Sequence, residues 1–252
     1  MSNPLLDGTY SGRSDVWDQL ASCQKEERPI HQVRKLVLKG AVDVVFFRAD
    51  TAHLVVAGEN KEVIRRITTR LEGDKLVIEQ EGITISNGGG SIRVSGSGNI
   101  VAGGTIYVGG SGRSGMHVQV SGGVASVAIG GQCVIGVALP EAPVVRVKGS
   151  GDVDLYDIQQ TELDVRVQGS GDISVCGHVE HFSAEVQGSG DIDAAELIAQ
   201  TAELSVAGSG DIDAHVTTAV TARVAGSGDI VVRGGPPSRK QSVAGSGDIK
   251  FK

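Results

Sequence analysis

Aromatic residues are scarce in this chain: they make up 3% of its 252 residues, which include 37 glycines. A core built around a few large rings is therefore excluded, and small and β-branched side chains must fill the interior by repetition. Basic runs are missing too, and the net charge is −7 with a pI near 5.4. Both features argue against a nucleic-acid partner and against binding to an anionic membrane surface.

Paired cysteines and long apolar runs are also absent. The three cysteines, Cys23, Cys133 and Cys176, are an odd number without a CxxC pair, so neither a disulfide framework nor a zinc knuckle is indicated. No apolar run of about 20 residues occurs, and the N-terminus lacks the basic start and apolar stretch of a signal peptide. We therefore expect reduced thiols, no membrane insertion and a cytoplasmic location. The cell envelope is the alternative if an export signal precedes Met1.

One motif is abundant: Gly-Ser-Gly followed by Asp or Asn and then by Ile or Val. It begins at Gly96, Gly149, Gly169, Gly188, Gly208, Gly226 and Gly245. The last six starts are 18 to 20 residues apart, a spacing typical of a solenoid with one coil per repeat. Between the first two starts, short β-type runs alternate with glycine pairs, which predicts two or three degenerate coils there.

Within the repeats, apolar and polar residues alternate with a period of two, which is typical of strands with one buried face. The residue two positions before the first glycine is always valine: Val94, Val147, Val167, Val186, Val206, Val224 and Val243. Stacked coils would place such residues in ladders with about 4.8 Å between coils. The glycine pairs predict corners that need positive φ or close backbone approach.

The predicted fold is an all-β solenoid with coils of about 19 residues. Residues 1–30 form an N-terminal segment, in which a helix over residues 14–27 is expected to cap the first coil, with Ser14 as N-cap and Trp17, Leu20 and Ala21 on one face. Residues 31–252 form a single solenoid domain. It comprises an irregular first part at 31–90 with a polar or helical crossing near 62–69, degenerate glycine-rich coils at 91–148 and regular coils at 149–252.

Two longer segments carry a family resemblance. The segment VLKGAVDVVFFRADTAHLVVAGENKEVIRRITTRLEGDKLVIE, followed by LPEAPVVRVKGSGDVDL and the GSGDI repeats, resembles the head GIN domain family, described as auto-transporter adhesin domains. The resemblance covers nearly the whole chain, from Val33 to Phe251. It implies a single-stranded right-handed β-helix and an adhesin-like function. Typical members carry an export signal or lipoprotein start, from which this sequence departs.

A column of acidic residues follows the glycines: Asn99, Asp152, Asp172, Asp191, Asp211, Asp229 and Asp248, each preceded at two positions by a serine. Stacked carboxylates repel one another, so something must compensate. We favour turn chemistry, in which Asp and Ser oxygens accept hydrogen bonds from corner N–H groups. The alternative is a ladder of calcium ions, by analogy with β-roll repeats, which makes the six aspartates candidate metal ligands.

Two other groups of residues are candidate sites. Second carboxylates at Asp154, Asp193 and Asp213 permit glycosidase or lyase chemistry, but their equivalent positions favour a solvated acidic face. Cys176, His178 and His181 form a C-x-H-x-x-H pattern that is expected not to converge on a metal. We therefore predict no catalytic residues and no cofactor.

The predicted function is a non-catalytic scaffold or binding module, adhesin-like, with a protein or glycan ligand. The alternative is a carbohydrate-binding or carbohydrate-active β-helix protein of the cell envelope. The last repeat still follows the pattern at Val243, Ile249 and Phe251, and no capping segment follows it. An uncapped coil end exposes unpaired strand edges, so we expect a homo-oligomer formed through a coil end.

Overall fold

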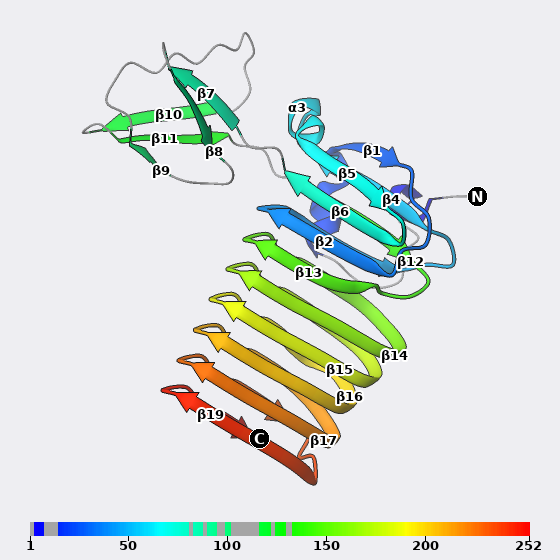
Figure 1. Ribbon diagram of the computed structural model, residues 1–252. Helices are drawn as coiled ribbons and strands as arrows, with labels where there is room; N and C mark the ends of the chain where they lie inside the picture. Colours follow the sequence, from blue (N-terminus) through cyan, green and yellow to red (C-terminus); the bar gives the residue numbers. More distant parts are fainter. Residues whose placement is uncertain are drawn as a thin grey trace.

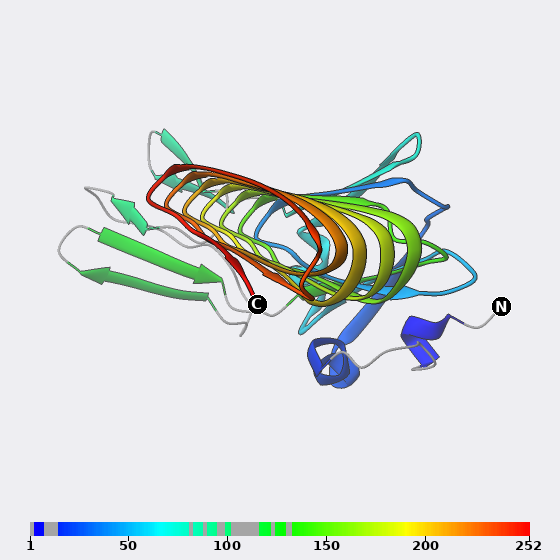
Figure 2. The same cartoon turned by 90° about the horizontal axis from the view of Figure 1, so that it is seen from below.

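The computed structural model describes residues 3–7, 15–80, 83–87, 90–94, 99–101, 116–121, 124–129 and 133–252. Its main body is a single sheet of 15 strands wound into stacked parallel coils (Figure 1). Seen along the stack, the successive coils follow one another around a common flattened interior (Figure 2). The predicted β-solenoid is confirmed.

The regular coils are built from long strands that run along one face, round a bend and back along the other. These strands are β14 (Val153–Gly169), β15 (Ile173–Gly188), β16 (Ile192–Gly208) and β17 (Ile212–Gly226). Their register places the predicted valines in one buried ladder, in which Val206 lies between Val186 and Val224. The alternation predicted from the sequence is confirmed on either side of the bend, where every second residue faces the interior.

The solenoid has two faces. The flat face consists of β6 (Lys75–Gln80), β2 (Lys35–Gly40), β13 (Val144–Gly149), the second halves of β14 to β17 and β19 (Ser238–Gly245). The opposite face consists of β4 (His53–Gly58), β12 (Cys133–Leu139), β3 (Asp43–Arg48), the first halves of β14 to β17, β18 (Ile230–Arg233) and β20 (Ile249–Phe251).

The glycine corners connect the two faces, and there the backbones of neighbouring coils nearly touch. Gly208 has a φ of +145°, a conformation that residues with a Cβ rarely adopt. Gly210 needs no unusual φ, but a Cβ on it would lie 2.0 Å from the carbonyl oxygen of Gly190. Both glycines of the motif are therefore required, the first for its conformation and both for the close approach.

The first coils are assembled out of chain order. β6 pairs in parallel with β2, which pairs with β13, and β12 inserts between β4 and β3. Three residues separate Gly149 of β13 from Val153 of β14, whereas residues 81–132, which we call the excursion, separate β6 from β12.

The strands in this excursion differ from the degenerate coils predicted for residues 91–148. β7 (Ile83–Asn87) and β8 (Gly90–Val94) form an antiparallel pair, and β9 (Asn99–Val101), β11 (Val124–Ile129) and β10 (Met116–Ser121) form an antiparallel three-stranded sheet. Among the described strands that lie within residues 91–148, only β12 and β13 join the solenoid. Antiparallel pairing of chain neighbours closes short loops at little entropic cost, whereas a coil needs an in-register partner on the preceding coil. Gly96 and Ser97 lie outside the described residues.

The first coil is closed by elements other than the predicted helix. Helix α3 (Lys61–Arg65) packs Ile64 into the core, and β1 (Gln24–Arg28) and β5 (Ile67–Glu72) pair antiparallel with β4 and β6 as charged edge strands. This helix lies where a polar or helical crossing was predicted.

The N-terminal segment, with α1 (Pro4–Asp7), α2 (Asp15–Gln19) and η1 (Leu20–Ser22), packs against the outside of the opposite face instead of the coil end. Trp17 lies edge-on to Phe47 and fills the space that a side chain at Gly136 would need. The reason is that β3, β4 and β12 carry apolar residues on both sides, and their outer side needs cover. Ser14, the predicted N-cap, lies outside the described residues.

The last coil carries polar side chains at positions that are apolar in the other coils. In register, Arg239 follows Val220 and Gln241 follows Ala222. The Arg239 guanidinium lies 4.5 Å from the centre of the Phe251 ring, and its Nε donates to the carbonyl oxygen of Pro236. These substitutions cover part of the coil end, although Val243 remains 45% exposed.

Candidate functional site

The acidic column forms a continuous hydrogen-bonded ladder along the corners. In each coil the backbone N–H of the aspartate donates to Oδ1 of the aspartate in the preceding coil, over 2.7 to 3.1 Å. The column comprises Asp43, Asp152, Asp172, Asp191, Asp211, Asp229 and Asp248. These bonds account for the repeated aspartates by turn chemistry, and among the described residues no cluster of three or more metal-ligating side chains occurs.

The first member of this ladder was missed in the sequence. Asp43 follows the corner Gly40-Ala41-Val42, which lacks the Ser-Gly of the motif, and Asn99 belongs to β9 instead of the ladder. Burial raises the pKa of Asp43. At the other end, a hydrogen bond from Lys250 lowers the pKa of Asp229, so part of the repulsion between carboxylates is offset there.

Replacing Asp191 with Ala should lower the free energy of unfolding by about 1 kcal/mol, because the backbone N–H of Asp211 loses its acceptor. Asp191→Asn keeps an oxygen at this position and should lose less. Calcium chelation should leave the melting temperature of the unmodified protein unchanged. These shifts can be measured by circular dichroism melts, and a large rise of the melting temperature on adding calcium would instead favour a cation ladder.

The second carboxylates lie on the outside of the opposite face. Both carboxylate oxygens of Asp213 accept from Arg233, and Asp193 accepts from the backbone N–H of Ala195. Burial raises the pKa of Asp154, whose in-register neighbour on the next coil is Ser174 and not a second acid. Asp193 and Asp213 are in-register neighbours on adjacent coils, but the ion pair with Arg233 gives Asp213 different surroundings. Asp154 is separated from Asp193 by the coil that carries Ser174.

Cys176, His178 and His181 do not converge. Cys176 is half-buried beside Glu196, and His178 is exposed on the bend next to Ile198. His181 lies beyond the bend, on the flat face, where its Nδ1 is 2.6 Å from Oγ1 of Thr201. Parity along the strand fails here because the alternation of buried and exposed residues is interrupted at the bend, where Glu180 and His181 are both exposed.

The clearest concave feature is a groove along the start of the flat-face strands. It consists of two hollows of about 470 Å³ and 900 Å³ that share Glu162 and Asp164. The first crosses β14, β15, β16, β17 and β19, and the second extends it towards Arg34 and Val144. We call the whole feature the long groove.

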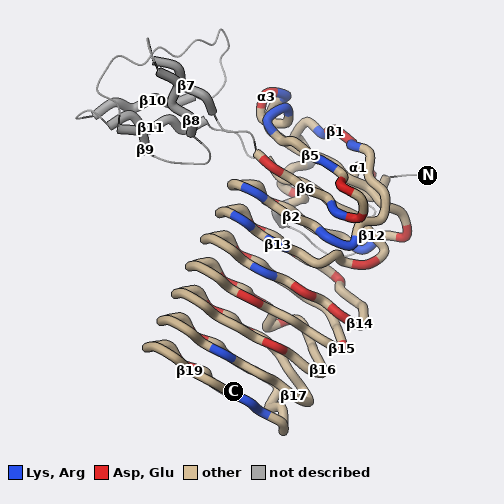
Figure 3. Tube along the Cα trace, in the orientation of Figure 1, with Lys and Arg blue, Asp and Glu red and all other residues tan. Residues whose placement is uncertain are grey.

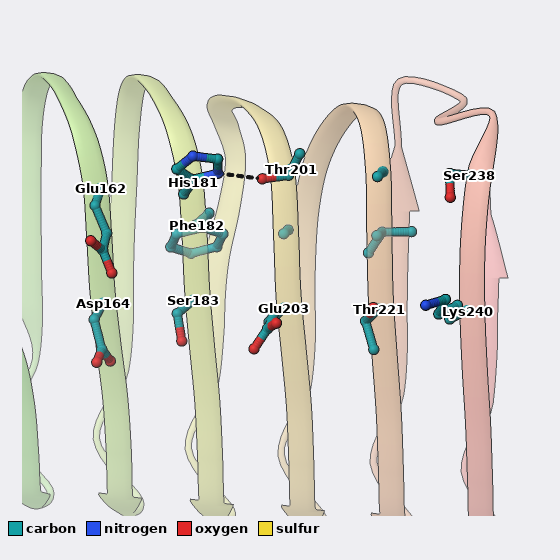
Figure 4. A pocket seen from close by; sticks show the side chains of 13 residues that line it. Glu162, Asp164, His181, Phe182, Ser183, Thr201, Glu203, Thr221, Ser238 and Lys240 are labelled. Carbon is teal, nitrogen blue, oxygen red and sulfur yellow. Dashed lines mark hydrogen bonds between the residues drawn. The ribbon is translucent and has the colours of Figure 1, made fainter.

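The side chains of the long groove are arranged in rows across the coils (Figure 4). One row contains Glu162, His181, Thr201 and Ser238, and the next contains Asp164, Ser183, Glu203, Thr221 and Lys240. The polar lining of the first hollow therefore consists of hydroxyl and carboxylate groups with one imidazole and one ammonium, and Phe182, Ala202, Ala219 and Val220 supply apolar surface between them. The spacing along each row follows the coils, at about 4.8 Å.

The long groove offers little for covalent catalysis. His181 contacts Thr201, but both lie open to solvent, and the groove floor is a sheet whose backbone N–H groups are engaged with neighbouring coils. No free pair of N–H donors is therefore available on this floor to stabilise an oxyanion. The groove instead presents side chains that can form hydrogen bonds, repeated from coil to coil.

A long parallel solenoid with a hydrogen-bonding groove across its coils defines an adhesin-like class of protein, without indication of a catalytic function. The chain belongs to the family described as "Putative auto-transporter adhesin, head GIN domain", whose model matches residues 33–236. The family predicted from the sequence is confirmed. No curated protein matches the chain.

Solved structures support the fold. A "putative adhesin" from Bacteroides fragilis NCTC 9343 is 17% identical with a TM-score of 0.60, and the match covers 91% of this chain and 97% of that one. A "putative lipid binding protein" from Parabacteroides distasonis ATCC 8503 is 20% identical with a TM-score of 0.52, covering 91% of this chain and 96% of that one. Within the described residues, no helix has the length and apolarity needed to cross a membrane.

Proposed function

We propose that this protein is a non-catalytic binding module that holds a polysaccharide in the long groove. The observation that carries the proposal is the groove itself, which crosses five strands with hydroxyl and carboxylate side chains in register. Such groups match the many hydroxyls of a sugar chain, which can donate to carboxylates and both donate to and accept from Ser and Thr.

A polysaccharide fits this groove better than an extended peptide does. Peptide strands are commonly bound through the backbone at a sheet edge. The floor of the long groove lies within the sheet, where the backbone groups of β15 and β16 already pair with neighbours on both sides. A ligand here must be recognised by side chains, and its own hydrogen-bonding groups must be distributed along its length.

Filling the groove should abolish this binding. In a double variant with Ser183→Arg and Thr221→Arg, two long side chains occupy the second row, and we expect affinity for any bound glycan to fall at least about tenfold because hydrogen bonds are lost. The glycan would first be identified on a glycan array and then titrated by calorimetry.

The matched control is Thr218→Arg, which adds the same side chain at an exposed position outside the groove and should bind normally. Unchanged melting temperatures would show that all variants are folded. Undiminished binding by the double variant, or the absence of any glycan ligand, would contradict the proposal.

A second proposal concerns self-association through the C-terminal coil end. Here β19 pairs only with β17, β20 pairs only with β18, and all residues of β19 are exposed. Because α3, β1 and β5 close the other end, a two-fold joint between C-terminal ends is favoured over a head-to-tail filament. Arg239 and Lys240 oppose this joint by like-charge repulsion, whereas Lys250 is neutralised by Asp229. Light scattering that gives a monomer at every concentration would rule it out.

The location in the cell is proposed as cytoplasmic, with the envelope as the alternative. The three cysteines are free thiols, as suits a reducing compartment, and burial raises the pKa of Cys133 to about 12, which keeps this thiol unreactive. Cell fractionation of the native protein separates the two locations, and an extracellular fraction would favour adhesion over an internal scaffold.

A further inference from the structure

Positive charge gathers on one part of the flat face, in a protein whose net charge is −7. Lys and Arg lie along β2, β13 and the adjacent part of β14, whereas β15 and β16 carry Asp and Glu (Figure 3). Three pairs of in-register neighbours on adjacent strands carry like charge: Lys35 with Lys75, Lys39 with Lys148, and Arg146 with Arg166. Like charges directly opposite one another on adjacent strands are destabilising, so this arrangement has a cost that folding does not explain.

The cations at the rim of this region are neutralised. Lys39 lies 3.8 Å from Glu79, Lys75 pairs with Glu72, and Arg166 pairs with Asp164 and Glu185. These ion pairs leave the centre of the region uncompensated.

The three central cations are Lys35, Arg146 and Lys148, which we call the basic patch. In the part of the chain that the structure describes, none of them has an ion pair or a side-chain hydrogen bond. The Nε of Arg146 is buried without any partner. Burial and then the neighbouring cations, Arg146 first among them, lower the pKa of Lys35. An anion placed at the accessible part of the Arg146 guanidinium and the two ammonium groups would compensate their charge.

We infer that the basic patch is a subsite for a carboxylate or sulfate group of an acidic polysaccharide. The guanidinium of Arg146 offers parallel N–H donors that suit such a group, and the two lysines add flexible ammonium donors. The inference takes from the proposed function only the class of ligand. It adds that the ligand is acidic and that its charge is bound outside the long groove.

The position of the basic patch favours a narrow chain. Val144, which lines the long groove, is the in-register neighbour of Lys35, so a chain in the groove passes beside the patch. A nucleic-acid duplex or a lipid bilayer would cover the whole face and meet Glu162, Glu185 and Glu203 as well. The same carboxylates repel a continuous polyanion, so the acidic groups of the ligand are spaced by neutral sugars.

Two oligosaccharides test the inference by calorimetry: chitotetraose, which is neutral, and a hyaluronan tetrasaccharide, which has a carboxylate on alternate sugars. The wild-type protein should bind the hyaluronan fragment about tenfold more tightly, since one charge-assisted contact is added. This advantage should shrink at high salt and should disappear in R146Q and in K148Q. Arg146 is partly buried, so R146Q can also change the stability of the fold. Lys148 is exposed, so K148Q tests binding separately from folding.

The matched control is R223Q, which removes an exposed and unpaired cation from the same row of the same face, away from the patch, and should bind like wild type. Three results would overturn the inference. They are equal affinity for the two oligosaccharides, wild-type affinity for hyaluronan in both R146Q and K148Q, and tighter binding of polyglutamate than of the hyaluronan fragment. Equal affinities that are both lost in the groove double variant would leave the proposed function standing. Hyaluronan binding that depends on Lys148 but not on the groove would refute the proposed function and support the basic patch.

Discussion

Replacing Val206 with Asp is expected to unfold the middle of the solenoid and to lower the free energy of unfolding by about 4 kcal/mol or more, since an unpaired charge enters a packed core. Val206 is 1% exposed and lies in the ladder between Val186 and Val224. The carboxylate would find no donor there, because the residues above and below it are valines. Urea melts followed by circular dichroism would measure the loss.

The control for this substitution is the next residue along the strand. Ala207 is exposed on the flat face, so Ala207→Asp should change stability little. Cys176→Ser, at a half-buried position on the bend, should also be mild. Equal melting temperatures for Val206→Asp and Ala207→Asp would contradict the assignment of the ladder.

Replacing Gly210 with Ala should cost about 3 kcal/mol, because overpacking at this corner has no route of relief. The added Cβ would lie 2.0 Å from the carbonyl oxygen of Gly190 and 2.9 Å from Cγ1 of Val186. The oxygen belongs to the backbone of the preceding coil, so relieving the contact means separating coils and breaking the hydrogen bonds between them. Thermal and chemical melts would report the change.

Gly235 is the comparison site for this prediction. It has a φ of +62°, but a Cβ added there would have no other atom within 4 Å, so Gly235→Ala meets backbone strain alone. We expect it to cost about 1 kcal/mol. If Gly210→Ala lowered the free energy of unfolding no more than Gly235→Ala does, the motif glycines would not be required for close packing at the corners.

The regular coils were predictable because their contacts are periodic in the chain. Each residue of β15 pairs with residues about one repeat away on either side, so a pattern along the sequence is also a pattern in space. The inward valines, the glycine corners and the aspartate column follow from this one rule. The head GIN family was recognisable for the same reason, since its repeats keep the motif.

The irregular parts were not predictable in this way. β12 inserts between β3 and β4 although β5, β6 and the strands of the excursion precede it in the chain. Trp17 was expected at a coil end, but it covers Phe47, because the outer side of the first coils is apolar. Asp43 joins the aspartate ladder without the motif that marks the other members. In each case the partner is chosen by packing between segments far apart in the sequence.

The sites depend on register across the bends. Shifts between Leu155 and Ile158 in β14, and between Ser174 and Cys176 in β15, decide which residues of neighbouring coils meet. The row of Glu162, His181 and Thr201 follows from these shifts. His178 and His181 are separated by the bend itself, where Glu180 and His181 are both exposed. The basic patch likewise joins Lys35 to Arg146 and Lys148 from a strand more than 100 residues later.

The sequence by itself determined the coil, the ladder and the family, because a repeat of 18 to 20 residues with one buried face has a single way to bury that face, by stacking on its neighbours. Only the tertiary structure decided the long groove, the basic patch and the closure of the coil ends. These features depend on which outward side chains become neighbours, and outward residues are not constrained by the repeat. Their positions follow from the bends, the out-of-order first coils and the excursion between β6 and β12.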